Sequence, residues 1–170
     1  MNRLNQKIVE ILKQHPEGED FFDALDAMVR GDMSILNTFL MFIESNVEPK
    51  TKTLVLTGQF GVALMNLYVE RLQKLFSDII LVNGGIRTGA EPIIFREKII
   101  NPHCVMLDDS FYSGTTRNNI EKALKAIHSG ASIDTTFVVY DGSKTSRYDV
   151  KSMFRYHSEK PLLENDLVDK

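Results

Sequence analysis

The sequence lacks several features that mark particular classes of protein. It contains a single cysteine, Cys104, so no disulfide can form within the chain, and a reducing compartment fits this composition best. No apolar run reaches the length of a membrane-spanning helix, and residues 1–20 lack the long apolar core of a signal peptide. We therefore expect a cytoplasmic protein that does not cross a membrane.

Neither sign of charge is in large excess. The formal net charge is −3, and charged residues make up 25% of the chain. This balance favours neither nucleic acid nor an anionic membrane as a partner, but it leaves room for a local basic patch. The histidines show no metal-ligand spacing among themselves or with Cys104, and no Ser-His-Asp grouping can be read.

No internal repeat, low-complexity tract or evident linker divides the 170 residues. The length and the hydrophobic content of 43% fit one globular domain with a substantial core. Within this single domain, residues 1–170, we distinguish a helical N-terminal segment at 1–48, a core at 49–142 and a C-terminal extension at 143–170.

The clearest chemical pattern is CVMLDDSFYSGTT, residues 104–116. An apolar run ends in Asp108 and Asp109, a hydroxyl-rich turn follows, and apolar residues then recur at helical spacing. The first amides of such a helix lack internal partners and attract anions, whereas paired carboxylates suit ribose hydroxyls or a hard cation such as Mg²⁺. The pattern predicts a site for a ribose 5-phosphate. The alternative is that the acidic pair and the turn only cap the helix.

Strand and helix patterns alternate around this stretch. Residues 3–45 look helical in three pieces, with Ser34 able to cap the third. An apolar strand starts at Thr53 and leads through a glycine-flanked turn into a helix, and further strands are indicated at 79–82 and 133–140. This alternation predicts an α/β fold whose mainly parallel sheet is flanked by helices, with the ligand site at the carboxyl ends of the strands.

The pattern at 104–116 resembles the 5-phosphoribosyl 1-diphosphate (PRPP) signature of the type I phosphoribosyltransferases. The resemblance implies that fold, with the N-terminal helical segment as a candidate hood over the acceptor base. It implies a Mg²⁺-dependent transferase that moves the phosphoribosyl group of PRPP to a nitrogenous base and releases pyrophosphate. Asp108 and Asp109 would hold the ribose hydroxyls, and either could also hold the Mg²⁺ that enters with PRPP. The 5′-phosphate would be bound by Tyr112, Ser113, Gly114, Thr115 and Thr116.

The same resemblance suggests roles for two other segments. Family members have a diphosphate-binding loop after the first core strand, often with a Lys or Arg, and its place here is taken by Thr57, Gly58, Gln59, Phe60 and Gly61. A mobile hairpin in the family brings cations to the diphosphate, and the matching basic residues are Arg87, Arg96 and Lys98. We therefore count Arg96 and Lys98, with Asp108 and Asp109, as candidate catalytic residues. By themselves, the two segments also fit a plain strand-to-helix connection and a solvated hairpin.

Two readings of the function stay open. The Tyr-Ser-Gly form of the turn looks more like the pyrimidine attenuator branch of the family, so a regulator that senses PRPP or a nucleotide is the alternative to an enzyme. The tail mixes aromatic and basic side chains. These side chains could stack on a base or on RNA. The alternative is a surface strand and helix that pack their aromatic side chains inward. The family resemblance also suggests a homodimer.

Overall fold

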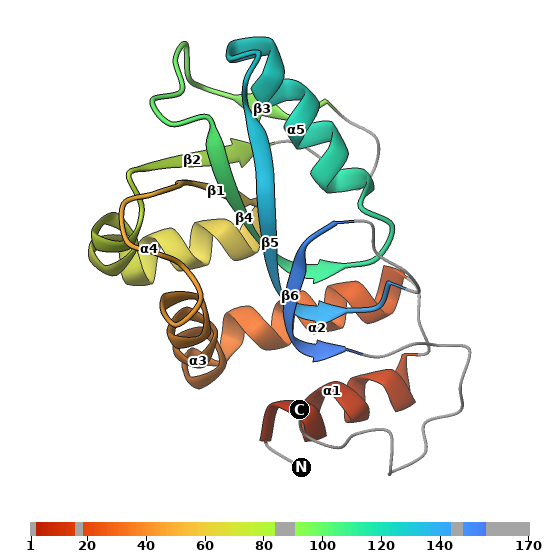
Figure 1. Ribbon diagram of the computed structural model, residues 1–170. Coiled ribbons are helices and arrows are strands. Elements are labelled where there is room, and N and C mark those ends of the chain that lie inside the picture. Colours follow the sequence, from red (N-terminus) through yellow and green to blue (C-terminus); the bar gives the residue numbers. More distant parts are fainter. Residues whose placement is uncertain (1–2, 16–18, 84–90, 144–147, 156–170) are drawn as a thin grey trace.

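The computed structural model describes residues 3–15, 19–83, 91–143 and 148–155. Helices and strands alternate along most of the chain (Figure 1). In order they are α1 (Arg3–Gln14), α2 (Glu19–Gly31), α3 (Met33–Glu44), β1 (Thr53–Thr57), α4 (Gly58–Leu75), β2 (Asp78–Asn83), β3 (Ile93–Ile94), β4 (His103–Phe111), α5 (Thr115–Ile127), β5 (Ser132–Asp141) and β6 (Val150–Arg155).

The strands of the described residues form one sheet in the order β3-β2-β1-β4-β5-β6. Neighbouring strands are parallel, except that β2 and β3 form an antiparallel pair. The central strands are in register, with Leu56 opposite both Leu81 and Leu107, so β1, β2 and β4 reach their carboxyl ends at one edge of the sheet. The predicted mainly parallel α/β sheet is confirmed.

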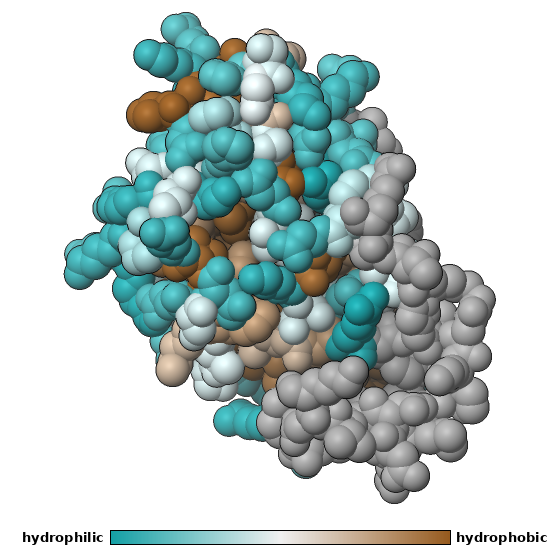
Figure 2. Space-filling view, viewed as in Figure 1, coloured by the Kyte–Doolittle hydropathy of each residue, from teal (hydrophilic) through white to brown (hydrophobic). Residues whose placement is uncertain are grey.

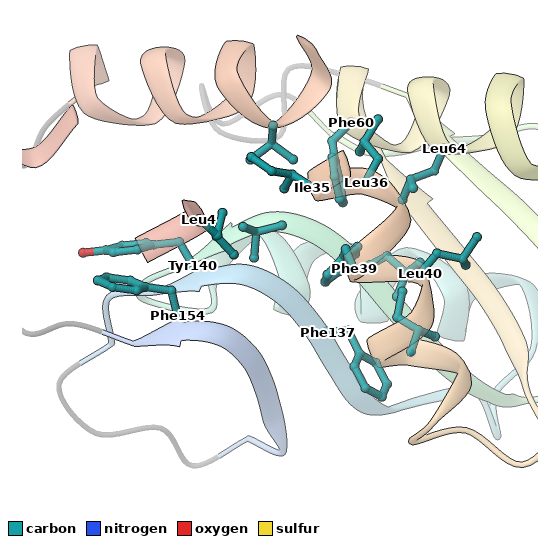
Figure 3. Packing of buried hydrophobic residues seen from close by; sticks show 14 of the residues in the cluster. Leu4, Ile35, Leu36, Phe39, Leu40, Phe60, Leu64, Phe137, Tyr140 and Phe154 are labelled. Atoms are coloured by element: carbon teal, nitrogen blue, oxygen red, sulfur yellow. The ribbon is translucent and has the colours of Figure 1, made fainter. Parts of the chain in front are cut away.

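Helices cover both faces of this sheet (Figure 1). Side chains alternate between the faces of a strand. Leu54 and Leu56 of β1 therefore join a core with α1, α2, α3 and α4, whereas Val55 joins a second core with Ile120 and Leu124 of α5. In the first core, Phe39 and Leu40 of α3 point toward the sheet and α4 (Figure 3), and the rings of Phe39 and Phe60 lie 5.4 Å apart.

The three N-terminal helices lie where their apolar spacing predicts them. The predicted capping residue of α3 is wrong, because the cap is Asp32 and not Ser34. Asp32 has an extended backbone, and its carboxylate accepts a hydrogen bond of 2.9 Å from the Ser34 amide. Sequence spacing alone does not separate these residues, since both types are common at this position.

The predicted glycine-flanked turn at 57–61 is the first turn of helix α4. β1 ends at Thr57 and α4 begins at Gly58, whose φ of 58° turns the chain within one residue. A Cβ on Gly61 would lie 2.9 Å from the Leu56 Cβ, so the helix packs directly on the strand that precedes it. No loop separates the two elements.

The C-terminal extension adds strand β6 to the sheet, parallel to β5. Phe154 of β6 is buried and its ring stacks on Tyr140, with 5.9 Å between ring centroids (Figure 3). For this residue, the inward-packing alternative is the correct one. Hydrophilic side chains cover most of the described surface in the view of Figure 2. No helix of the described residues combines the length and apolar character that crossing a lipid bilayer requires.

Candidate functional site

The acidic pair lies inside a strand, near its carboxyl end. β4 continues through Asp108 and Asp109 as far as Phe111. The two carboxylates therefore belong to successive residues of one strand. Asp109 is buried, at 5% exposure, and its amide donates a 3.0 Å hydrogen bond to Asp108 Oδ1. Burial, and then the charge of Asp109, raises the pKa of Asp108 well above its ordinary value. A hydroxyl donor or a cation bound at this pair would therefore stabilise its ionised form.

Thr57 connects this pair to the neighbouring strand. The Thr57 side chain hydrogen-bonds to Asp108, and this bond acts to lower the Asp108 pKa against the larger effects of burial and Asp109. Thr57 is also the N-cap residue of α4, yet it makes no side-chain capping bond to that helix. The first turn of α4 is consequently not capped by the residue that begins it.

The predicted phosphate loop, residues 112–116, joins β4 to α5. Gly114 has a φ of 79° and is the N-cap of α5, so no side chain caps that helix from this position. The hydroxyls of Ser113 and Thr115 lie 2.9 Å apart, and the Thr115 amide donates to Ser113 Oγ at 3.4 Å. Hydroxyls and helix amides thus surround one short turn, which is the arrangement that an anion favours.

Helix α2 of the N-terminal segment reaches the same edge of the sheet. The Phe22 ring lies edge-on to Tyr112 at 6.3 Å, and the Phe21 ring lies edge-on to Tyr140 at 5.0 Å. Tyr112 keeps 44% of its surface exposed beside Phe22. The structure therefore brings the candidate hood next to the phosphate loop.

The residues predicted to bind a diphosphate are not all available to a ligand. Gly58 and Gln59 are exposed at the start of α4. Phe60 is buried and packs against Phe39, so it belongs to the core. What this segment can offer to an anion is the start of a helix rather than a loop.

The structure does not bring the described candidate cations to the acidic pair. Arg96 donates from Nη2 to Asp78 Oδ1 at 3.1 Å and to the Ile79 carbonyl at 2.9 Å. Asp78 begins β2 at the amino end, which lies about 13 Å along the strands from the level of Asp108. Lys98 is exposed on the connection from β3 to the start of β4. Arg87 lies outside the described residues.

Sequence reasoning missed a polar cluster at the end of β5. Asp141 is buried, accepts hydrogen bonds from the Ser143 amide at 2.9 Å and the Ser143 hydroxyl at 2.6 Å, and pairs with Arg155 at 3.3 Å. In the sheet Asp141 lies opposite Phe111, next to the phosphate loop. An acidic residue followed by Gly-Ser directly after an apolar strand is the sequence signal for this cluster.

The residues present fit a Mg²⁺ ion that a phosphate ligand also holds. Asp108 and Asp109 supply the carboxylate oxygens that Mg²⁺ prefers. Among the described residues, no three His, Cys, Asp or Glu side chains gather in a way that could hold a metal by themselves. One or two carboxylates plus substrate phosphates are a usual environment for this ion.

Comparison with solved structures identifies proteins of similar fold. Adenine phosphoribosyltransferase from Thermoanaerobacter pseudethanolicus superposes with a TM-score of 0.55 at 15% identity, over 75% of this chain and 84% of that chain. Orotate phosphoribosyltransferase from Aeropyrum pernix gives 0.54 at 17% identity, over 74% and 73%. The Trypanosoma brucei adenine enzyme, in complex with AMP, pyrophosphate and ribose-5-phosphate, gives 0.51 at 11% identity, over 75% and 67%.

Comparisons of the sequence itself gave no match. No family model matches the chain, and no curated protein matches it. The similarity to known proteins therefore lies in the arrangement of strands and helices. This chain has the type I phosphoribosyltransferase fold.

Proposed function

We propose that this chain transfers the phosphoribosyl group of PRPP to a ring nitrogen of a base, with release of pyrophosphate and formation of a nucleotide. The observation that carries the proposal is the position of the acidic pair. Asp108 and Asp109 lie at the carboxyl edge of the sheet, on β4, while the starts of α4 and α5 follow the adjacent strands β1 and β4. Neither helix is capped by the side chain of its N-cap residue.

This arrangement matches a ligand that carries anionic groups at both ends of a ribose. The start of α5 and the hydroxyls of Ser113 and Thr115 would bind the 5′-phosphate. The start of α4, with Gln59, would bind the diphosphate. Asp108 and Asp109 would accept hydrogen bonds from the hydroxyls of the ribose, which lies between the two anionic groups of the ligand. The fold neighbours named above are phosphoribosyltransferases, which supports this assignment.

In the proposed reaction the bond from C1′ to the diphosphate oxygen breaks, a bond from C1′ to the base nitrogen forms, and the proton that this nitrogen carries in the free base is released to solvent. Positive charge develops on the ribose, where ionised Asp108 and Asp109 would stabilise it. Mg²⁺, when bound, would offset the negative charge on the departing diphosphate. Arg87, Arg96 and Lys98 are proposed to help offset that negative charge. For Arg96 this requires movement of its segment and loss of its pairing with Asp78.

The acceptor would bind between α2 and the phosphate loop. Phe22 and the exposed Tyr112 lie there, and aromatic rings suit a planar base. We further propose a cytoplasmic homodimer of single-domain subunits, in keeping with the family resemblance.

The deciding experiment measures pyrophosphate release from PRPP and Mg²⁺ across a panel of purine and pyrimidine bases. PRPP binding is followed calorimetrically on the same sample. Release that depends on one base would support the proposal and identify the acceptor. Binding of neither PRPP nor ribose 5-phosphate would contradict it.

A sensor of PRPP or a nucleotide is the second candidate. The observation that favours it concerns the part of the chain that the structure describes: residues 57–61 contain no Lys or Arg, and Arg96 pairs with Asp78 at the amino end of β2. PRPP binding without release for any base would support the sensor. Release with a single base would exclude it.

A further inference from the structure

Tyr148, which precedes β6, lies directly on the phosphate loop. A Cβ added to Gly114 would be 2.6 Å from Tyr148 Cε2, so the ring covers the backbone of this glycine. The rings of Tyr148 and Phe111, the last residue of β4, lie edge-on at 6.1 Å. The aromatic ring therefore fills the space next to the left-handed turn that begins α5.

The same ring also binds the first turn of α5. The Arg117 guanidinium lies over the ring, 4.2 Å from its centroid, and the Tyr148 hydroxyl donates to Asn118 Oδ1 at 2.7 Å. Arg117 is buried, pairs with Glu121 at 3.0 Å and donates to the Ile133 carbonyl. Its charge is therefore committed to protein groups, and the phosphate would depend on amides and hydroxyls.

The chain around Tyr148 is itself fixed to the sheet. The Thr136 amide donates to the Asp149 carbonyl at 2.9 Å, and the Thr135 hydroxyl donates to the Asp149 carboxylate at 2.7 Å. β6 then continues in parallel with β5. The backbone next to Tyr148 is thus bonded to the sheet, while the Tyr148 side chain contacts the phosphate loop and the first turn of α5.

We infer that Tyr148 is a positioning residue for the phosphate site, a role that rests on the proposed function. By fixing Gly114, Arg117 and Asn118 in the folded protein, it sets the direction of the loop amides before the ligand arrives. A loop that is already ordered loses less conformational entropy on binding. The C-terminal segment would accordingly belong to the active site without touching the substrate.

The test compares Tyr148→Leu, Tyr148→Phe and, as a matched control, Phe154→Leu. Phe154 is an aromatic of the same segment that packs on Tyr140 instead of the phosphate loop. Calorimetry measures binding of ribose 5-phosphate and of pyrophosphate, and thermal melting measures stability. We expect Tyr148→Leu to weaken ribose 5-phosphate binding at least about tenfold. Tyr148→Phe keeps the ring, removes the hydrogen bond to Asn118 and should weaken ribose 5-phosphate binding about threefold.

Pyrophosphate binding should change in neither Tyr148 variant, and the Phe154→Leu control should lose stability without losing affinity for ribose 5-phosphate. Unchanged ribose 5-phosphate affinity in Tyr148→Leu would overturn the inference while leaving the proposed function intact. If Tyr148→Leu does not fold, unchanged affinity in Tyr148→Phe overturns it equally. A wild-type protein that binds neither PRPP nor ribose 5-phosphate overturns both proposals. One that binds them without base-dependent release overturns only the transferase.

Discussion

The Thr57 side chain hydrogen-bonds to Asp108 across the pair formed by β1 and β4, instead of capping the helix that Thr57 begins. The Thr57 hydroxyl therefore bonds to a residue of the acidic pair, and Thr57 does not cap the start of α4. This relationship connects the two segments that are predicted to bind the ribose and the diphosphate.

Replacement of Thr57 by valine tests this connection. The Thr57 hydrogen bond lowers the Asp108 pKa, so Thr57→Val should raise that pKa further and make Asp108 harder to ionise. We expect Mg²⁺-dependent PRPP binding to shift to higher pH, as measured by calorimetry between pH 6 and 9. Thr57→Ser keeps a hydroxyl and is the matched control. The same pH profile in the valine and serine variants would contradict the assignment.

Replacement of Asp108 by asparagine should stabilise the ligand-free protein, and increasingly so as the pH rises. Burial and Asp109 raise the folded-state pKa of Asp108 above its unfolded value, so the wild type loses stability as the pH rises through the folded pKa. Asparagine does not ionise and avoids this loss. Thermal melting from pH 4 to pH 8 checks the prediction. A stabilisation that shrinks with rising pH would show that Asp108 is not the group responsible.

The double variant Asp108→Asn with Asp109→Asn should lose PRPP binding and keep its fold. Each carboxylate is proposed to accept a charge-assisted hydrogen bond, so we expect affinity at least about 100-fold weaker by calorimetry. The control is Asp134→Asn, which changes an acidic residue near the amino end of β5 that pairs with Lys52. Wild-type affinity in the double variant would remove the acidic pair from the site.

Replacement of Arg96 by alanine separates a catalytic role from a structural one. If Arg96 reaches the diphosphate, turnover should fall on the order of 10²-fold with a smaller change in PRPP affinity. Lys98→Ala should act in the same direction. Asp78→Asn is the control, because it weakens the ion pair that holds Arg96 at the amino end of β2 and leaves the arginine in place. Wild-type turnover in Arg96→Ala would confine Arg96 to that ion pair.

Replacement of Gly61 by alanine should destabilise the protein by about 1–3 kcal/mol, the usual cost of overpacking. The new methyl group would lie 2.9 Å from the Leu56 Cβ and 3.0 Å from its carbonyl carbon, neither of which can move freely. Gly31→Ala is the control, since a Cβ at Gly31 meets nothing within 4 Å. Urea titration of both variants measures the difference. Equal midpoints would mean that α4 does not pack closely on β1.

Much of the fold could be predicted because it depends on local patterns. The apolar spacing of α1, α2 and α3 and the apolar runs of β1, β4 and β5 are visible in any short window of the sequence. Two boundaries depend on individual residues instead. The glycine turn after β1 proved to be helix because Gly58 reverses the chain in one residue, and Asp32 rather than Ser34 caps α3.

In the candidate site, too, some features follow from the local sequence and others only from the tertiary structure. The sequence by itself determined that an acidic pair, a glycine turn and a helix follow one another on β4, since covalent order fixes their spacing. Only the tertiary structure decided that Thr57 binds Asp108, that Phe22 lies beside Tyr112, and that Tyr148 covers Gly114. It also placed Arg96 at the opposite edge of the sheet. Such contacts join residues far apart in the chain, and they depend on strand order and register, which no local periodicity encodes.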